Sequence, residues 1–305
     1  MIQINQKIFN LEQTFGGSII TQVQNPLLEQ YNIELWVKRD DLLHPVISGN
    51  KWRKLKYIVN HALSLGANRL VSMGGAYSNH LHALAYVSKQ LGLSCTGIIR
   101  GERPEVLNPT LADLELWGMD MEFISRQQFR DLRGYKNFDD SPGKCRQGYW
   151  IPEGGASALA LEGVAELAAE IESSFDVICL ACGTGTTLAG LLMALNNVSR
   201  IIGFAALKGA GFLQSDINAM LRQSKIMAKA DWEINQDYHF GGFARTNKEL
   251  LDFIDAFTRN TTIALDPVYN GKMFYGVYDL IKRGHIQAGQ RILAIHTGGL
   301  QGARG

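Results

Sequence analysis

Lys51 lies in a basic stretch of the sequence that could carry out covalent chemistry. Residues 48–57, SGNKWRKLKY, contain four cationic side chains, and Lys51 follows a Ser-Gly pair at the expected start of a helix. A lysine with a lowered pKa can form an imine with a carbonyl compound. A solvated helix surface has the same composition, so this stretch alone leaves both interpretations open.

A phosphate-binding loop is predicted where an apolar segment ends and a helix is expected to begin. The loop consists of Gly183, Thr184, Gly185, Thr186 and Thr187. Glycines permit a tight turn with accessible N–H groups, hydroxyls add donors, and a helix N-terminus attracts anions. The residues that follow fit neither the P-loop pattern nor the dinucleotide-binding spacing. An ordinary tight turn is the structural alternative.

Polar residues occur at three other positions where ligand contacts are common. Ser78 and Asn79 follow an expected strand, with Ser78 suited to cap the next helix. Tyr269 lies in DPVYNGKM, whose Asp-Pro and Asn-Gly pairs are typical of turns. Thr297 follows the last expected strand. In α/β proteins such positions border the ligand site, but each is weak evidence alone.

A metal or redox site is not expected. His80 and His82 are two residues apart, so on a helix they point to different faces. Cys179 and Cys182 lie in an apolar segment with no second pair, which is typical of buried cysteines.

Short apolar runs alternate with amphipathic runs, which predicts an α/β fold with two open, twisted parallel-sheet domains. We place the larger domain at residues 1–50 plus 156–305 and the smaller domain at 51–155, with the site between them. Strands are expected at 33–40, 68–75, 94–101, 119–125, 200–207 and 289–299. Helices are expected at 51–66, 78–92, 110–118 and 158–173, and a strand, glycine turn and helix at 175–195.

Composition restricts the class of protein. The 305 residues are 46% hydrophobic, and the net charge is +1, which gives no reason to expect a nucleic-acid or acidic membrane partner. No signal peptide or membrane span is expected. Four cysteines suit a reducing cytoplasm. We therefore expect a cytoplasmic protein with a small-molecule ligand.

Five ordered segments, GNKWRKL, GGAYSNH, GTGTTLAG, DPVYNGK and HTGG, resemble one family over nearly the whole chain. It is the family of pyridoxal-phosphate enzymes that includes 1-aminocyclopropane-1-carboxylate deaminase and D-cysteine desulfhydrase. The resemblance implies pyridoxal phosphate as cofactor, bound in the cleft between the domains of a tryptophan synthase β-like fold (fold type II). By analogy it also implies a homodimer and a small amino acid as substrate.

The resemblance also implies cofactor contacts. Lys51 would form the imine with pyridoxal phosphate, and Lys54, on the same helix face, would contact the phosphate together with residues 183–187. Asn79 would bond the 3′-oxygen of the ring. Thr297 would face the pyridine nitrogen, which makes the ring a milder electron sink than a carboxylate partner would.

Other residues are assigned by the same resemblance. Ser78 would touch the substrate carboxylate, Tyr269 would lie over the cofactor, and Tyr77 and Asn79 would border the substrate. Gly154 and Gly155 also match a glycine pair of the family. Arg53 and Lys56 are interpreted as surface charges.

The sequence departs from the family near the substrate. Tyr77 replaces a glutamine, and Ala294 and Ile295 stand where the deaminases have a tyrosine near the final H-x-G-G. Relatives often continue further at the C-terminus, so the far wall of the site is expected to differ. The departures favour α,β-elimination, with D-cysteine giving pyruvate, sulfide and ammonia, over cyclopropane opening.

Several alternatives stay open. The protein could be a 1-aminocyclopropane-1-carboxylate deaminase, or a deaminase of another small D-amino acid such as D-serine or a chlorinated alanine. A non-catalytic carrier or sensor of pyridoxal phosphate is a further class, which the joint presence of Lys51, Ser78 and Tyr269 disfavours. A nucleotide-binding Rossmann protein would need a glycine spacing that the loop does not have.

Overall fold

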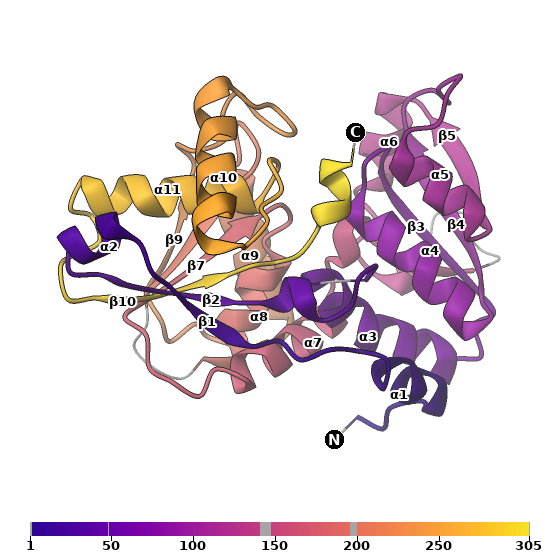
Figure 1. Cartoon of the computed structure of the whole chain (residues 1–305). Helices are drawn as coiled ribbons and strands as arrows, with labels where there is room; N and C mark the ends of the chain where they lie inside the picture. The colour runs from indigo at the N-terminus through magenta and orange to yellow at the C-terminus, as the bar shows by residue number, and fades with distance from the viewer. Residues whose placement is uncertain (1, 48, 141–147, 196–199, 305) are drawn as a thin grey trace.

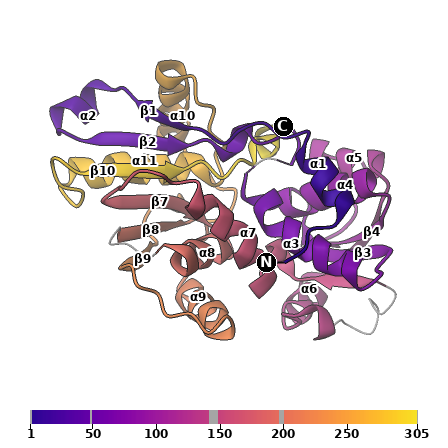
Figure 2. The same ribbon diagram turned by 90° about the horizontal axis from the view of Figure 1, so that it is seen from below.

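The computed structural model describes residues 2–47, 49–140, 148–195 and 200–304, so Ser48 of the basic stretch lies outside it. Its strands form two sheets, one of six strands and one of four. The two sheets and their helices lie side by side (Figure 1), and the view from below shows the same two bodies (Figure 2). This arrangement confirms the predicted α/β fold, while the residue boundaries of the two domains stay a prediction.

The larger sheet has the strand order β1-β2-β10-β7-β8-β9, and all neighbours are parallel except β1 and β2. The central strands β7 and β10 are almost entirely buried, as expected of a sheet covered on both faces. Its strands are β1 (Ile20–Val23), β2 (Glu34–Lys38), β7 (Val177–Cys182), β8 (Arg200–Ala205), β9 (Trp232–Asn235) and β10 (Arg291–Ile295).

The smaller sheet has the order β5-β4-β3-β6 and is parallel throughout. In its register, Gly75 at the end of β3 lies opposite Arg100 at the end of β4. The carboxyl ends of these strands therefore present neighbouring residues at one edge of the sheet. Its strands are β3 (Arg69–Gly75), β4 (Ser94–Arg100), β5 (Met119–Ile124) and β6 (Tyr149–Ile151).

Helices connect the parallel strands and cover both sheets. The α-helices are α1 (Gln6–Glu12), α2 (Pro26–Gln30), α3 (Asn50–Ser64), α4 (Asn79–Leu91), α5 (Pro109–Leu116), α6 (Arg126–Leu132), α7 (Ala158–Ala169), α8 (Thr186–Ala194), α9 (Phe212–Gln223), α10 (Lys248–Thr261) and α11 (Asn270–Lys282). Short 3-10 turns are η1 (Asp40–Leu42), η2 (Phe138–Asp140), η4 (Glu153–Gly155) and η5 (Leu300–Ala303). None of the helices in the described part of the chain is long and apolar enough to cross a membrane.

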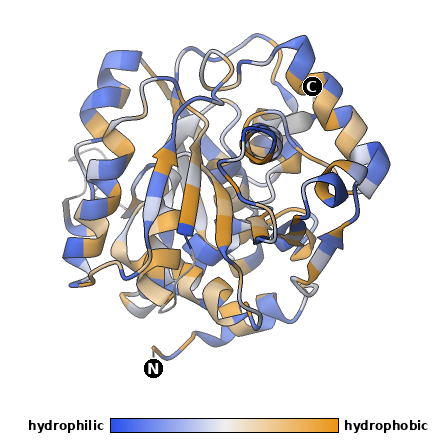
Figure 3. Cartoon of the chain, turned by 90° about the vertical axis from the view of Figure 1, so that its left-hand side faces the viewer, coloured by the Kyte–Doolittle hydropathy of each residue, from blue (hydrophilic) through white to orange (hydrophobic). Residues whose placement is uncertain are grey.

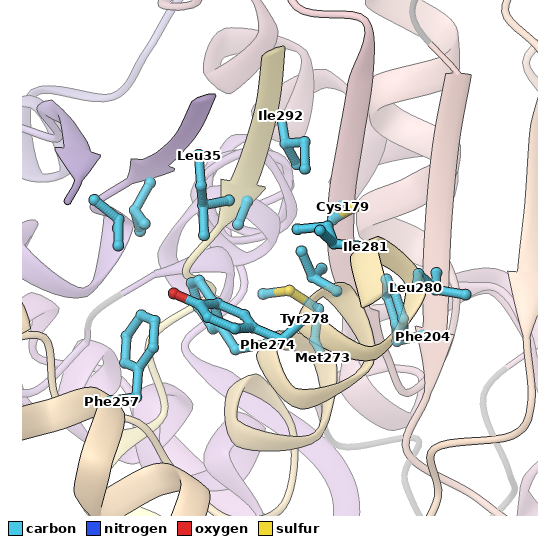
Figure 4. Close-up of a cluster of buried hydrophobic side chains, with 14 of the residues drawn as sticks. Leu35, Cys179, Phe204, Phe257, Met273, Phe274, Tyr278, Leu280, Ile281 and Ile292 are labelled. Atoms are coloured by element: carbon cyan, nitrogen blue, oxygen red, sulfur yellow. The ribbon is translucent and has the colours of Figure 1, made fainter. Parts of the chain in front are cut away.

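Separate apolar clusters fill the faces of the two sheets. On one face of the larger sheet, Leu35, Cys179 and Phe204 pack against Met273 and Phe274 of α11 (Figure 4). Helices α7, α8 and α9 cover the other face. Coloured by hydropathy, the strands are mostly hydrophobic while the outer sides of the helices are hydrophilic (Figure 3). Cys179 and Cys182 are buried free thiols, so they belong to this core as predicted.

Helix α3 joins the two bodies, and this contact corrects the prediction that Arg53 is a surface charge. The Arg53 side chain is buried, and its guanidinium bonds Asp40 at 2.9 Å and Glu170 at 2.5 Å. Helices α3 and α7 are so close that a Cβ atom on Gly163 of α7 would lie 1.8 Å from the Arg53 carbonyl oxygen. The charge of Arg53 therefore serves the packing of α3 on the larger body.

The prediction that Lys56 is a surface charge is wrong for the same reason. Its Nζ atom bonds Glu166 of α7 at 2.8 Å and Glu12 of α1 at 3.0 Å, and the residue is 9% exposed. Arg53 and Lys56 are three residues apart, so they share the helix face that α7 covers.

The predicted Asn-Gly turn is also wrong, because Asn270 and Gly271 begin helix α11. The carboxylate of Asp266 accepts hydrogen bonds from the backbone N–H groups of Val268, Tyr269 and Asn270, at 2.7–3.0 Å. This carboxylate satisfies the first donors of the helix, which allows the helix to begin at Asn270.

Candidate functional site

A cleft of about 930 Å³ collects nearly all of the residues that the sequence singled out. Its lining is formed where α3, the carboxyl ends of β3 and β7, and the loops before α11 and after β10 meet. Thr186 and Gly155 are not among the lining residues: Thr186 is buried, and its hydroxyl lies 2.9 Å from that of Thr184. The predicted residues that line it are Lys51, Lys54, Tyr77, Ser78, Asn79, Gly154, Gly183, Thr184, Gly185, Thr187, Tyr269 and Thr297.

Lys51 occupies the first turn of α3, with its amine in the cleft. Burial lowers the pKa of Lys51 to about 8, although the nearby charge of Asp266 acts in the opposite direction. Gly49, just before the helix, has φ +67°, and a Cβ atom there would lie 2.0 Å from the carbonyl oxygen of Thr297. The glycine thus lets the start of α3 approach the end of β10. A lysine with this pKa is uncharged often enough to act as a nucleophile or base near neutral pH.

Asn50 is a site residue that the sequence analysis missed. It is 6% exposed, and its Oδ1 atom accepts a hydrogen bond from Nζ of Lys51 at 2.5 Å. Its Nδ2 atom donates to Oγ1 of Thr187 at 3.0 Å, and its backbone N–H bonds Thr297. The one available signal was its place directly before Lys51 in the basic stretch.

The glycine-threonine loop has the shape of an anion-binding site. Gly185 has φ +73°, and a Cβ atom on it would lie 2.6 Å from Ile217, so a side chain does not fit there. Helix α8 begins at Thr186 without a side-chain cap, which leaves its first N–H groups available to a ligand. These features fit the phosphate group of pyridoxal phosphate.

Lys54 supplies the positive charge that such a phosphate needs. It is 5% exposed and lines the cleft, and the structure shows no hydrogen bond or ion pair between its amine and a described residue. Burial and the charge of Lys51 hold the pKa of Lys54 well below its usual range. A buried ammonium without a counter-ion is unfavourable, and a bound phosphate would compensate it.

Ser78 and Asn79 face the cleft from the start of α4. Ser78 caps the helix as predicted, with its Oγ atom accepting the N–H of Leu81 at 3.2 Å. A Cβ atom on Gly74 would lie 2.5 Å from that oxygen, so the glycine makes room for the serine. Because its oxygen is an acceptor in this bond, the hydroxyl hydrogen of Ser78 is free to be donated to a ligand. Tyr77 beside it is 56% exposed.

Tyr269 and Thr297 border the cleft from the larger body. A Cβ atom on Gly183 would lie 3.3 Å from the ring of Tyr269, so the ring lies against the glycine loop. Burial raises the pKa of Tyr269 above its usual range, which keeps the phenol protonated. The Thr297 hydroxyl and backbone N–H both bond Oδ1 of Asn270, at 3.2 and 3.1 Å. These contacts fix the orientation of the threonine.

His80 is a second residue whose place in the site was not predicted. Its Nε2 atom lies 2.9 Å from the hydroxyl of Ser72, which itself donates to the Ile151 carbonyl oxygen at 2.8 Å. The imidazole therefore donates from Nε2, and its Nδ1 atom is a buried acceptor without a partner among the described residues. Burial, together with the charges of Lys51 and Lys54, lowers the pKa of His80 to about 3.

The fold and this cleft are those of an α/β protein in which a buried lysine lies beside a loop suited to an anion. The chain belongs to the pyridoxal-phosphate dependent enzyme family, whose model matches residues 17–298. The predicted family, cofactor and fold type are thereby confirmed. The role of each site residue toward the cofactor stays a prediction.

Relatives with printed names cover most of the chain. A Pyrococcus horikoshii protein named "Putative 1-aminocyclopropane-1-carboxylate deaminase" is 32% identical over 98% of this chain and 96% of its own. The Arabidopsis thaliana "Bifunctional D-cysteine desulfhydrase/1-aminocyclopropane-1-carboxylate deaminase, mitochondrial" is 31% identical over 88% of this chain and 73% of its own. The solved structure of an ACC deaminase homologue superposes with a TM-score of 0.81 at 30% identity, covering 99% of this chain and 97% of that one.

Proposed function

We propose that the protein removes the β-substituent and the amino group from a small amino acid, with D-cysteine as the favoured substrate. One water is consumed, and the products are pyruvate, ammonia and hydrogen sulfide. The observation that carries the proposal is the common cleft of Lys51, Ser78 and the residue 183–187 loop. The Arabidopsis relative, whose name includes D-cysteine desulfhydrase, supports this choice of substrate.

Pyridoxal phosphate supplies the electron sink for the bond cleavage at the substrate α-carbon. The glycine-threonine loop and Lys54 would hold its phosphate, and Asn79 would hold the ring 3′-oxygen. Lys51, with a pKa near 8, has an amine able to accept the α-proton at Nζ near neutral pH. Asn50 orients that amine through its Oδ1 atom.

Ser78 would bind the substrate carboxylate. Its oxygen already accepts the Leu81 N–H, so its hydroxyl proton points toward a partner other than the helix. A hydrogen bond from a hydroxyl to a carboxylate is short and strong, which fixes the amino acid relative to Lys51. Tyr269, held protonated by burial, is a second donor in the same cleft.

Thr297 would face the ring nitrogen with a neutral hydroxyl, whose hydrogen would turn from Oδ1 of Asn270 to the ring when the cofactor binds. A neutral partner does not stabilise a protonated ring nitrogen as a carboxylate would, so the ring withdraws electrons less strongly. The nearby carboxylate of Asp266 is already occupied by backbone N–H groups and by Nδ2 of Asn270. This environment favours elimination over transamination.

A 1-aminocyclopropane-1-carboxylate deaminase is the second candidate, which the names of the relatives support equally. Cyclopropane opening needs a placed nucleophile or base, because the substrate has no α-hydrogen. Ala294 and Ile295, at the positions of the missing tyrosine, are fully buried in β10 and do not line the cleft. Neither replaces that tyrosine. Among the described residues the phenols that line the cleft are Tyr77, Tyr135 and Tyr269, and the first two are exposed, so the loss of the family tyrosine favours elimination.

The test is the absorbance of the pyridoxal-phosphate-loaded protein with D-cysteine, L-cysteine and 1-aminocyclopropane-1-carboxylate in parallel. The expected result is a band shift with sulfide and pyruvate from D-cysteine. Release of 2-oxobutanoate and ammonia from the cyclopropane compound alone would favour the second candidate. Lys51→Ala is the control: an enzyme loses turnover, whereas a non-catalytic sensor would still respond to ligand.

A further inference from the structure

The mouth of the cleft carries cationic side chains that the reaction proposed above does not use. Arg100, Arg126, Lys136 and Lys208 all line it. Within the described part of the chain, the structure shows no ion pair from any of these four to a carboxylate. All four side chains are exposed, and an excess of one sign of charge around a cleft raises the local concentration of ligands of the opposite sign.

A fifth cation of the mouth shows how such a charge is neutralised when it has a structural role. The guanidinium of Arg133 bonds the carboxylate of Glu153 at 2.5 Å. Asp216 is the other acidic residue among the described residues that line the cleft. The mouth therefore keeps an excess of positive charge. This charge is separate from that of Lys51 and Lys54, which the cofactor phosphate would compensate.

Arg100 is the best-placed of these cations. It ends β4 directly opposite Gly75, which is three residues before Ser78. Its Nη2 atom lies 3.8 Å from the position that a Cβ atom on Gly75 would occupy. Its guanidinium also lies over the ring of Phe129, 5.6 Å from the centroid, which restrains it. The charge is thus held one strand away from the turn that presents Ser78.

The cleft has to hold both pyridoxal phosphate and the substrate. Its volume of about 930 Å³ is near the upper end of the range, about 300–1,000 Å³, that is typical of small-molecule sites. A small amino acid with one carboxylate, bound at Ser78 and Asn79, would leave the cations of the mouth without a partner. An arginine that presents a planar set of donors suits a phosphate oxygen pair.

We propose that the preferred substrate is an amino acid whose β-substituent is a phosphate ester, held by Arg100 and the other cations of the mouth. This rests on the proposed elimination and names its substrate class; D-cysteine would then react as a smaller analogue. The Cα–H and Cβ–O bonds break, and phosphate leaves with the electron pair of the Cβ–O bond. With one water consumed, O-phosphoserine gives pyruvate, ammonia and inorganic phosphate.

The kinetic test compares O-phosphoserine with serine, in both enantiomers, on the holoenzyme. Arg100→Gln is expected to lower the ratio of kcat/KM for O-phosphoserine to kcat/KM for serine about tenfold, which corresponds to about 1.4 kcal/mol. Arg103→Gln is the matched control, because Arg103 also lies over a phenylalanine ring but pairs with Glu115 outside the cleft. An equal loss for serine and phosphoserine in Arg100→Gln, or no loss at all, would overturn the proposal.

A binding measurement keeps this outcome separate from failure of the elimination itself. Calorimetry on the holoenzyme uses 3-phosphoglycerate, which has a carboxylate and a phosphate but no amine to react. Binding weakened about tenfold in Arg100→Gln, and unchanged in Arg103→Gln, supports the anion site even if no amino acid is turned over. Absence of binding, or equal affinity in both variants, rejects it even if D-cysteine is a substrate.

Discussion

Asn50 accepts a hydrogen bond from the amine of Lys51 at 2.5 Å and donates one to the hydroxyl of Thr187 at 3.0 Å. A single buried amide therefore connects the lysine that is predicted to bind the cofactor with the loop that is predicted to hold its phosphate. The two ends of the cofactor site are positioned together, although 137 residues separate Asn50 from Thr187.

Asn50→Ala is expected to weaken the binding of pyridoxal phosphate about tenfold or more, because it removes two buried hydrogen bonds worth about 1 kcal/mol each. The measurement is a titration of the apoprotein followed by absorbance. Asn247→Ala is the matched control, since Asn247 caps α10 outside the cleft. Equal affinity in Asn50→Ala and the wild type would show that the amide does not position the lysine.

The rate at which the apoprotein captures pyridoxal phosphate should depend on pH through Lys51. The reacting form is the uncharged amine, and burial lowers the pKa of Lys51 to about 8. The rate should therefore rise as pH increases to about 8 and level off above it. A blocked lysine peptide, with an ordinary pKa of about 10.4, is the reference. A rate for the protein that still rises tenfold per pH unit up to pH 10 would contradict the lowered pKa.

Gly185→Ala should destabilise the protein more than Gly209→Ala. Both glycines have φ near +70°, so both substitutions place a side chain in the left-handed region. At Gly185 the new Cβ atom would also meet Ile217 at 2.6 Å, whereas nothing lies within 4 Å at Gly209. Urea unfolding should show an extra loss of about 1–3 kcal/mol for Gly185→Ala from overpacking. Similar losses in the two variants would mean that the loop adjusts to the side chain.

Arg53→Met should cost about 3–5 kcal/mol of unfolding free energy, because it leaves the buried carboxylate of Asp40 without its ion pair. Arg200→Met is the comparison, since Arg200 pairs with Glu233 at the exposed surface. Exposed pairs contribute about 0–1 kcal/mol. Denaturant titration of the apoproteins gives both values. A small loss at Arg53 would indicate that water reaches Asp40 once the guanidinium is removed.

Local chemistry accounts for what the sequence predicted well. Ser78 is the N-cap of α4, as its residue type and place before a helix indicated. The turn at Gly185 requires a positive φ, which a glycine between threonines indicates without any tertiary contact. Both features depend on residues within a few positions along the chain, so one sequence was enough to find them.

The failures at Arg53, Lys56 and Asn50 share a dependence on distant residues. Arg53 and Lys56 look like surface charges until Glu170 and Glu166, more than 100 residues later, lie against them. Asn50 gains its role from Thr187. The strand-by-strand pattern gives no register between such segments, so these contacts could not be derived from it. The error at Asn270 was local instead. The carboxylate of Asp266, four residues earlier, accepts the Asn270 N–H, so the Asn-Gly pair begins a helix and does not form a turn.

Helix α3 belongs to both bodies of the protein. Its apolar side, including Leu55, packs in the core of the smaller sheet, while its first turn is bonded through the Asn50 N–H to Thr297 of the larger body. Because one helix is anchored in both bodies, Lys51 in its first turn stands at their junction, and any change in the packing of α3 on either body would be felt at its amine.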